Sequence, residues 1–161
     1  MEQTDFRNAV ERNSQRLFLL SLSFVRSHAD AEDILQDVFL RLWTRAPAFE
    51  DETHMDKWLT CVCVNACRNL LRSPFRKRCT VSSEEADTLY TFDSVQDRDL
   101  FCAVMQLPDR ERTVVHLFYY EDLPVREIAE TLHIGESAVK TALHRARNHL
   151  KEHLKEDGTH A

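Results

Sequence analysis

Apolar residues recur at helical spacing along most of this chain, and that spacing constrains the fold more than any other feature. Residues 31–45 show it most clearly, because their large apolar side chains fall on one face of a helix: Ile34, Leu35, Val38, Phe39, Leu42 and Trp43. No stretch shows the period-two alternation of a half-buried strand. The chain has two glycines and four prolines, too few for a turn-rich all-β fold. The sequence therefore predicts an all-α protein.

Polar breaks and prolines divide the chain into helical segments. A first helix is predicted over residues 4–26, with apolar positions at Phe6, Val10, Leu17, Leu20 and Phe24. Asp30 is predicted to cap a second helix over residues 31–45. A third helix over residues 55–72 would bury Leu59, Cys63, Ala66 and Leu70. Four more helices are predicted, at residues 98–106, 109–120, 125–132 and 136–153.

The net charge of the chain is concentrated between these two groups of helices. Residues 82–99 carry six acidic residues against one arginine, which is most of the net charge of −6. Such composition is typical of a solvated linker. We therefore predict two small helical domains with a linker and a tail, at residues 1–76, 77–98 (linker), 99–155 and 156–161 (tail). The folded parts are then nearly neutral and can carry basic faces.

The compartment can also be predicted from composition. No apolar run approaches the roughly 20 residues of a membrane span, and the N-terminal MEQTDFRNAV lacks an apolar signal core. We therefore expect a cytoplasmic protein without stable membrane insertion. The five cysteines are an odd number and lie mostly within one helical stretch, which argues against a disulfide framework and fits a reducing compartment.

The segment VREIAETLHIGESAVKTALHRA fits a helix-turn-helix. Ala129 is the small residue where two helices cross, and Val139 packs the second helix back onto the first. His133 lies at the turn, a position that needs a positive φ, and histidine tolerates this better than most residues.

The second helix of this motif separates its apolar and polar residues. The predicted buried stripe is Val139, Leu143, Ala146 and Leu150, and a basic stripe beside it holds Lys140, His144, Arg147 and Lys151. The far side holds Ser137, Thr141, Arg145 and Asn148. A DNA major groove admits one such helix, whose side chains can bond base edges and phosphates. A solvated charged face is the alternative, and the helix-turn-helix spacing favours DNA.

Three segments in this order and spacing resemble a bacterial RNA polymerase sigma factor: HADAEDILQDVFLRLW, FEDETHMDKWLTCVCVNACRNLLR and LPDRERTVVHLFYYEDLPVREIAETLHIGESAVKTALHRAR. The family is sigma-70, in its short extracytoplasmic-function (ECF) form, and the resemblance covers about residues 5–153. It implies a promoter-recognition subunit with a sigma-2 and a sigma-4 domain joined by a tether. No catalytic constellation or cofactor motif is present in the sequence, so we expect the polymerisation chemistry to belong to a partner.

The resemblance implies that the outer face of the second helix binds the clamp helices of the largest polymerase subunit, through Asp33, Gln36, Asp37 and Leu40. A solvated acidic face with one exposed leucine is the alternative. The resemblance also implies contact with the polymerase flap and control by an anti-sigma factor.

The third helix has an outer face at helical spacing, formed by Trp58, Val62, Asn65, Asn69 and Arg72 and flanked by Arg68. Asparagines can read exposed base edges and arginines can hold phosphates. The resemblance implies that Asn65 and the preceding loop, with Phe49 and residues 50–55, hold a base flipped out of the minus-ten element. The alternative for Asn65 is a polar residue that is merely exposed. Trp58 is predicted to belong to the core rather than to a base-stacking platform. The basic run RSPFRKRC either follows the nucleic acid or is a solvated helix end.

The resemblance also implies that sigma-4 reads the minus-thirty-five element as duplex. The predicted residues are Ser137, Lys140, Thr141, His144, Arg145 and Arg147. Three positions depart from the family pattern: Ala142 stands where many relatives carry arginine, Asn69 replaces a common aspartate, and His133 replaces glycine. The departure at Ala142 puts one phosphate or base contact in doubt.

The cysteines and histidines do not predict a metal site. On a helix, Cys61 and Cys63 point about 200° apart, so only Cys63 and Cys67 share a face. His149 and His153 lie four residues apart, and we interpret that spacing as incidental. A redox role for Cys67 or Cys79 is a further alternative.

Two other functions compete with the sigma interpretation. A stand-alone helix-turn-helix regulator would bind a palindromic duplex as a dimer without polymerase. A pure interaction protein, which titrates another regulator, would make no DNA contact even with polymerase present.

Overall fold

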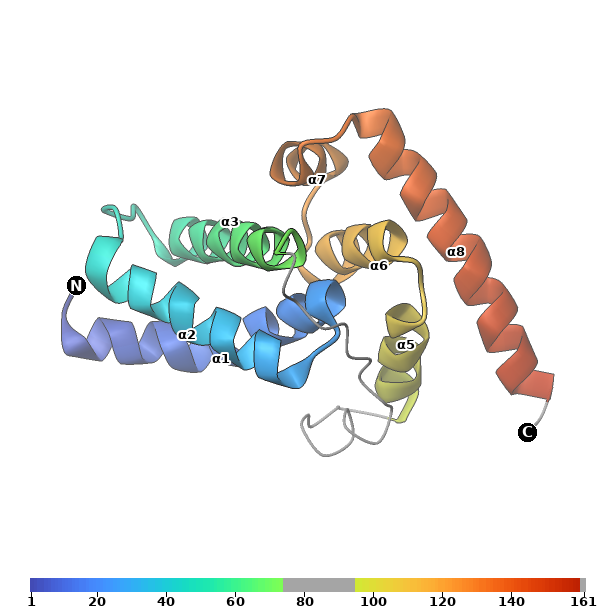
Figure 1. Ribbon diagram of the computed structural model, residues 1–161, viewed down its shortest axis with the longest axis horizontal. Helices are drawn as coiled ribbons and strands as arrows, with labels where there is room; N and C mark the ends of the chain where they lie inside the picture. Colours follow the sequence, from blue (N-terminus) through green and yellow to red (C-terminus); the bar gives the residue numbers. More distant parts are fainter. Residues whose placement is uncertain (74–94, 160–161) are drawn as a thin grey trace. The chain divides into compact units, whose positions relative to one another are not determined.

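The structure, a computed structural model, describes the backbone of residues 1–73 and 95–159 and the side chains of residues 1–73 and 98–153. All its regular elements are helices, and no strand occurs in these ranges, so the all-α prediction is confirmed (Figure 1). The chain divides into two compact units, Met1–Thr80 and Val81–Ala161. The basic run at residues 74–80 and most of the predicted linker lie outside the described residues. None of the described helices has the length and apolar character needed to cross a bilayer.

Unit 1 is a bundle of three helices, α1 (Gln3–Val25), α2 (His28–Arg45) and α3 (Glu52–Leu71), each of which packs against the other two (Figure 1). Its core is formed by Leu17, Leu20, Leu22, Val25, Ile34, Val38, Leu42, Leu59, Cys63, Val64 and Cys67. Ala66 and Leu70, which were predicted to be buried, are only half-buried. Because α3 packs against two helices at once, its buried face is centred on Cys63, Val64 and Cys67 instead.

The link between α1 and α2 is a two-residue reversal. Arg26 adopts a left-handed conformation (φ 52°), and its N–H donates to the carbonyl of Leu22 at 3.0 Å. Ser27 is extended, and its hydroxyl accepts from the N–H of Asp30 at 3.3 Å. Ser27 is therefore the N-cap of α2, and the prediction that Asp30 has this role is wrong. Asp30 lies in the first turn, where its negative charge stabilises the positive end of the helix dipole.

A polar network joins α1 to α3. Asn13 is buried, and its amide nitrogen donates to the Asp56 carboxylate at 3.1 Å while its oxygen accepts from Arg16 Nη2 at 2.7 Å. Arg16 also donates to the Thr60 hydroxyl at 2.7 Å, and Arg12 Nη2 donates to Asp56 at 3.0 Å. If α3 moved one turn along α1, these groups would lose their partners. The network therefore specifies the axial register of the two helices.

Unit 2 contains α5 (Val95–Met105), α6 (Asp109–Val115), a π-helical turn η1 (His116–Tyr120), α7 (Val125–Leu132) and α8 (Glu136–Thr159). The segment predicted as one helix over residues 109–120 is thus α6 and η1 in succession. Helix α8 packs against α5, α6 and α7. The core is formed by Phe101, Val104, Leu107, Val114, Val115, Leu117, Ile128, Leu132, Val139, Leu143 and Ala146. Helix α5 begins at Val95, three residues before the start that was predicted for this helix.

Two buried residues of α6, Arg112 and Glu111, have polar partners within unit 2. Arg112 is 1% exposed and donates to the carbonyl of Leu107 and to the Asp109 carboxylate, both at 2.8 Å. The buried Glu111 lies 2.7 Å from His149 Nδ1 on α8. These contacts tie α6 to the preceding loop and to α8, and they give His149 a structural partner.

We expect Asn13→Ala to lower the free energy of unfolding of unit 1 by about 2 kcal/mol, because it leaves Arg16 and Asp56 with unmade hydrogen bonds. Urea unfolding followed by tryptophan fluorescence measures this loss in unit 1, since both tryptophans, Trp43 and Trp58, lie there.

Arg7→Ala is the matched control for this substitution. The Arg7–Glu11 ion pair of 3.3 Å is solvent-exposed, so its loss should barely change the unfolding midpoint. Equal effects of the two substitutions would contradict a structural role for the network.

Candidate nucleic-acid interfaces

Helices α7 and α8 form the predicted helix-turn-helix (Figure 1). His133 ends α7 in the left-handed region, with φ 55° and ψ 45°, so the prediction of a positive φ at this residue is confirmed. The N–H of Ile134 donates to the carbonyl of Ala129 at 3.0 Å, which closes the end of α7. Ala129 is buried at the crossing, and the fully buried Val139 anchors α8.

The outer surface of α8 carries every side chain that was predicted to meet duplex DNA. All six are exposed: Ser137, Lys140, Thr141, His144, Arg145 and Arg147. The opposite face holds Val139, Leu143 and Ala146 in the core, with Leu150 half-buried. From Ser137 to Lys151 the helix has no acidic residue, so its outer surface is consistently basic or neutral. Such a surface is suited to a polyanion.

Ala142 does not belong to this outer surface. It is 4% exposed and lies with Val139 and Leu143 among the buried residues of α8. Its side chain therefore contributes to the packing of α8.

Arg147 differs from the other outward residues of α8, because a neighbouring element holds its side chain. Its Nε donates to the hydroxyl of Tyr119 in η1 at 2.8 Å. Its guanidinium carbon also lies 5.9 Å from the Phe118 ring centre and 5.8 Å from that of Tyr119. Among the six residues of α8 that were predicted to meet duplex DNA, all of them described, only Arg147 is held in this way by side chains of another element. The sequence did not point to Tyr119, because the two residues are far apart in the chain.

Helix α3 begins three residues earlier than predicted, so the loop before it is shorter than expected. Asp51 caps α3 by accepting from the N–H of His54 at 2.7 Å, so residues 52–55 form the first helical turn and not a loop. Asn65, Asn69 and Arg72 are exposed, and Arg68 is half-buried. Since these residues recur at helical spacing, they lie along one side of α3.

An aromatic cluster joins the loop to α3. The Phe49 ring meets the Trp58 ring edge-on, with 5.6 Å between centres, and the His54 ring at 5.5 Å. Trp58 is half-buried, so the prediction that it belongs to the core is wrong. The aromatic neighbour of its indole is the loop residue Phe49.

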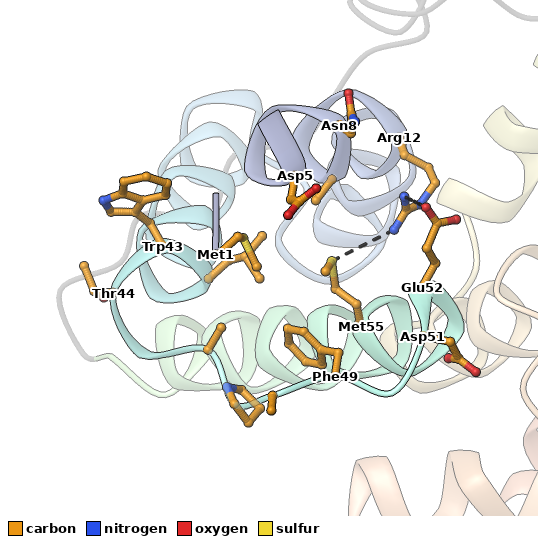
Figure 2. Close-up of a pocket in the computed structure, with 15 residues that line it drawn as sticks. Met1, Asp5, Asn8, Arg12, Trp43, Thr44, Phe49, Asp51, Glu52 and Met55 are labelled. Carbon is orange, nitrogen blue, oxygen red and sulfur yellow. Dashed lines mark hydrogen bonds and ion pairs between the residues drawn. The ribbon is translucent and has the colours of Figure 1, made fainter. Parts of the chain in front are cut away.

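A cavity of about 610 Å³ lies between α1, the end of α2, the loop and the start of α3 (Figure 2). Arg12 spans its wall, with 3.1 Å between its Nη1 and Glu52 and 4.0 Å between its Nη2 and the sulfur of Met55. Phe49 lines this cavity, but Asn65 does not. Asn65 lies ten residues beyond Met55 on α3, about 15 Å along the helix axis. The structure therefore does not bring the two predicted base-holding residues around one cavity.

The outer face of α2 combines acidic and apolar residues. Asp33, Gln36 and Leu40 are exposed, with Leu40 at 60%, and Asp37 pairs with Arg41 at 3.1 Å. Trp43 is 50% exposed, so its predicted place on the buried face is wrong.

The exposed Trp43 helps to form an apolar groove beside this face. Its ring packs edge-on against Phe6 of α1, with 5.0 Å between ring centres, because the N-terminal end of α1 extends past it. The groove, of about 450 Å³, is lined by Gln3, Phe6, Gln36, Phe39, Leu40 and Trp43. The sequence pattern identified Leu40 and Gln36 but missed the aromatic residues.

The cysteines of α3 lie on different sides of the helix. Cys61 is exposed, whereas Cys63 and Cys67 are buried in the core, and Cys63 Sγ lies 3.2 Å from the Ser21 hydroxyl. Within the described ranges, no group of three or more His, Cys, Asp or Glu side chains is arranged to hold a metal ion. Cys79 lies outside the described residues.

Comparison with known proteins relates both units to one family. Residues 9–77 match Sigma-70 region 2, and residues 97–150 match Sigma-70, region 4. The chain is 26% identical to the ECF RNA polymerase sigma factor SigW of Bacillus subtilis (strain 168), over 96% of this chain and 91% of SigW. It is 29% identical to the RNA polymerase sigma factor SigV of the same strain, over 92% of this chain and 90% of SigV.

Two solved structures are similar in fold. The first is the sigma factor RpoE in complex with the anti-sigma factor NepR from Bartonella quintana, with a TM-score of 0.69, 22% identity, and coverage of 94% of this chain and 97% of RpoE. The second is CnrH in complex with the cytosolic domain of CnrY, with a TM-score of 0.64, 25% identity, and coverage of 97% of this chain and 91% of CnrH.

The left-handed conformation of His133 can be tested by substitution. We expect His133→Gly to stabilise α7 and α8 by up to about 1 kcal/mol, because glycine adopts a positive φ without the steric cost of a Cβ atom. His133→Val should destabilise them, since a β-branched residue fits this conformation poorly. Hydrogen-exchange protection of the α7 and α8 amides measures both effects, and the opposite order of the two variants would contradict a strained turn.

Proposed function

The chain belongs to the sigma-70 family of RNA polymerase sigma factors, and from this premise we propose that it is a promoter-specificity subunit of bacterial RNA polymerase. It directs transcription initiation in the cytoplasm by recognising a minus-ten and a minus-thirty-five element, in response to stress or an envelope signal. The observation that carries this proposal is the presence, in one chain, of a region 2 match and a region 4 match, each with an exposed polar helix face.

In the second unit, α8 enters the major groove of the minus-thirty-five duplex. Lys140, Thr141, His144 and Arg145 reach base edges, while Ser137 and Arg147 hold the backbone. The support for this arrangement is that all six side chains are exposed and the opposite face of α8 is buried. The buried face holds the helix rigidly, so its outer side chains meet the groove in one orientation.

In the first unit, the opened strand of the minus-ten element follows the outer face of α3. Phe49 and Trp58 offer an aromatic surface on which a base can stack. Asn65 and Asn69 then accept and donate hydrogen bonds to bases, and Arg68 and Arg72 hold phosphates. From Trp58 to Arg72 this path extends about 20 Å, enough for several nucleotides. Asn65 does not line the cavity beside Phe49. We therefore assign the flipped base to the part of this path near Asn65, and not to that cavity.

The outer face of α2 binds core polymerase at the clamp helices of the largest subunit. Asp33, Gln36 and Asp37 supply polar contacts, and Leu40 supplies the exposed apolar anchor next to the groove of Phe6 and Trp43. An exposed apolar patch with a polar rim is characteristic of a protein interface. The second unit additionally contacts the polymerase flap.

We also propose an anti-sigma factor as a partner. RpoE was solved with an anti-sigma factor and CnrH with the cytosolic domain of CnrY, and the present chain is similar to both over most of its length. Sequestration by such a partner would link the chain to a signal.

The function can be tested by transcription from a pooled promoter library with the purified chain and bacterial core polymerase. We expect start sites that appear only with the chain, and about tenfold fewer transcripts with Asn65→Ala or Arg145→Ala, because each removes a direct base contact. Arg7→Ala, an exposed arginine outside every proposed surface, is the matched control.

This experiment, together with duplex binding by the chain alone, separates the competing functions. A stand-alone regulator would bind a palindromic duplex tightly without polymerase. An interaction protein would yield neither new start sites nor DNA binding in either condition. Either result would contradict the sigma interpretation.

Binding to core polymerase gives an independent test. We expect Leu40→Asp to weaken the affinity for core polymerase more than tenfold, because a charge replaces the apolar anchor. Leu71→Asp is the matched control, since Leu71 is also an exposed leucine of unit 1 but lies at the end of α3. Fluorescence anisotropy of labelled chain measures both affinities, and an unchanged affinity for Leu40→Asp would exclude the α2 face from the interface.

A further inference from the structure

The contact between Tyr119 and Arg147 joins a π-helical turn to the helix proposed to bind DNA. The Arg147 Nε–H donates to the Tyr119 hydroxyl at 2.8 Å. The rings of Phe118 and Tyr119 are nearly perpendicular, at 79° with 4.9 Å between centres, and the Arg147 guanidinium lies within 6 Å of both. One side chain of α8 is thus held by a hydrogen bond and by two cation–π contacts at once.

The π-helical turn brings Tyr119 to this position. The N–H of Glu121 donates to the carbonyl of His116 at 3.2 Å, which is the wider hydrogen bond of a π turn. His116 and Leu117 remain buried beneath it, whereas Tyr119 is 50% exposed and reaches Arg147. Single π turns of this kind occur frequently at functional sites.

The contact is poorly placed to stabilise the fold. Both Tyr119 and Arg147 are exposed, and α8 is already anchored by Val139, Leu143 and Ala146 in the core. Exposed contacts between long side chains contribute little to stability. A stabilising role therefore does not account for an arrangement that restricts the conformation of Arg147.

Restricting Arg147 has a clear consequence for binding. Among the described residues, none accepts a hydrogen bond from its two Nη nitrogens. These nitrogens carry the paired N–H groups that match a phosphate in a bidentate arrangement. If the guanidinium is already held, less side-chain entropy is lost when the phosphate binds.

We propose that Tyr119 is a positioning residue that holds the Arg147 guanidinium ready for a backbone phosphate of the minus-thirty-five duplex. Tyr119 acts through Arg147 and does not itself contact DNA. This inference rests on the proposed function of α8 and extends it to a residue outside the helix-turn-helix.

A double-mutant cycle on the assembled holoenzyme tests the proposal. The probe is the strongest promoter fragment recovered from the pooled library, and its affinity is measured over a range of KCl concentrations. We expect Arg147→Ala to weaken binding about tenfold. It should also lower the magnitude of the slope of log affinity against log salt by about one, the contribution of one phosphate contact. Tyr119→Phe should weaken binding about threefold, and the double variant should bind no more weakly than Arg147→Ala alone.

Tyr120→Phe is the matched control, since it removes a tyrosine hydroxyl from the same turn. The Tyr120 ring stacks on the His116 ring, with 4.8 Å between ring centres. This variant should leave binding unchanged. The thermal unfolding midpoint should be the same for Tyr119→Phe and the wild type. A loss of binding matched by a loss of stability would overturn the positioning role.

The remaining outcomes distinguish this proposal from the function on which it rests. The inference is wrong if Arg145→Ala weakens binding but Tyr119→Phe leaves the affinity unchanged. It is also wrong if the effect of Tyr119→Phe adds fully to that of Arg147→Ala, because Tyr119 then does not act through Arg147. Full additivity would mean that Tyr119 contacts DNA directly. If Arg145→Ala and Arg147→Ala are both silent, α8 is not the DNA-reading helix and both proposals fail.

Discussion

Each proposed binding surface of this protein lies on a helix whose opposite face is buried, so core packing determines where the surface points. On α2, Val38 and Leu42 are buried while Leu40 is exposed between them. On α8, Val139 and Ala146 are buried while Arg145 is exposed. Successive residues on a helix point about 100° apart. A rotation of the helix about its axis would therefore bury polar side chains and expose apolar ones, at a large cost in free energy. The hydrophobic core therefore also sets the orientation of the ligand-facing side chains.

Apolar contacts alone specify the position of one helix along another only weakly, and polar groups supply that information here. The Asn13–Asp56–Arg16 network specifies the register of α3 against α1, which places the N-terminus of α3 and the loop that carries Phe49. In unit 2, Glu111 and His149 connect α6 to α8 in a similar way. Buried polar networks of this kind contribute specificity more than net stability.

Charge is distributed so that the chain can be acidic while α8, the helix proposed to bind DNA, is not. Most of the net charge of −6 comes from residues 82–99, whereas α8 has no acidic residue between Ser137 and Lys151. Phosphate attraction dominates unaided DNA affinity, so an acidic chain should bind duplex weakly by itself. In the proposed function, polymerase compensates by delivering α8 to the promoter.

Sequence patterns were enough to predict the all-α fold class, the helix-turn-helix with its positive-φ His133, and the division of α8 into buried and exposed faces. These features are local, because helical periodicity and turn chemistry depend on residues a few positions apart. Helix packing was needed to establish that Trp43 is exposed and that Tyr119 holds Arg147. Such features depend on which helix lies beside which and on a π turn that departs from 3.6-residue periodicity, and neither is encoded in local spacing.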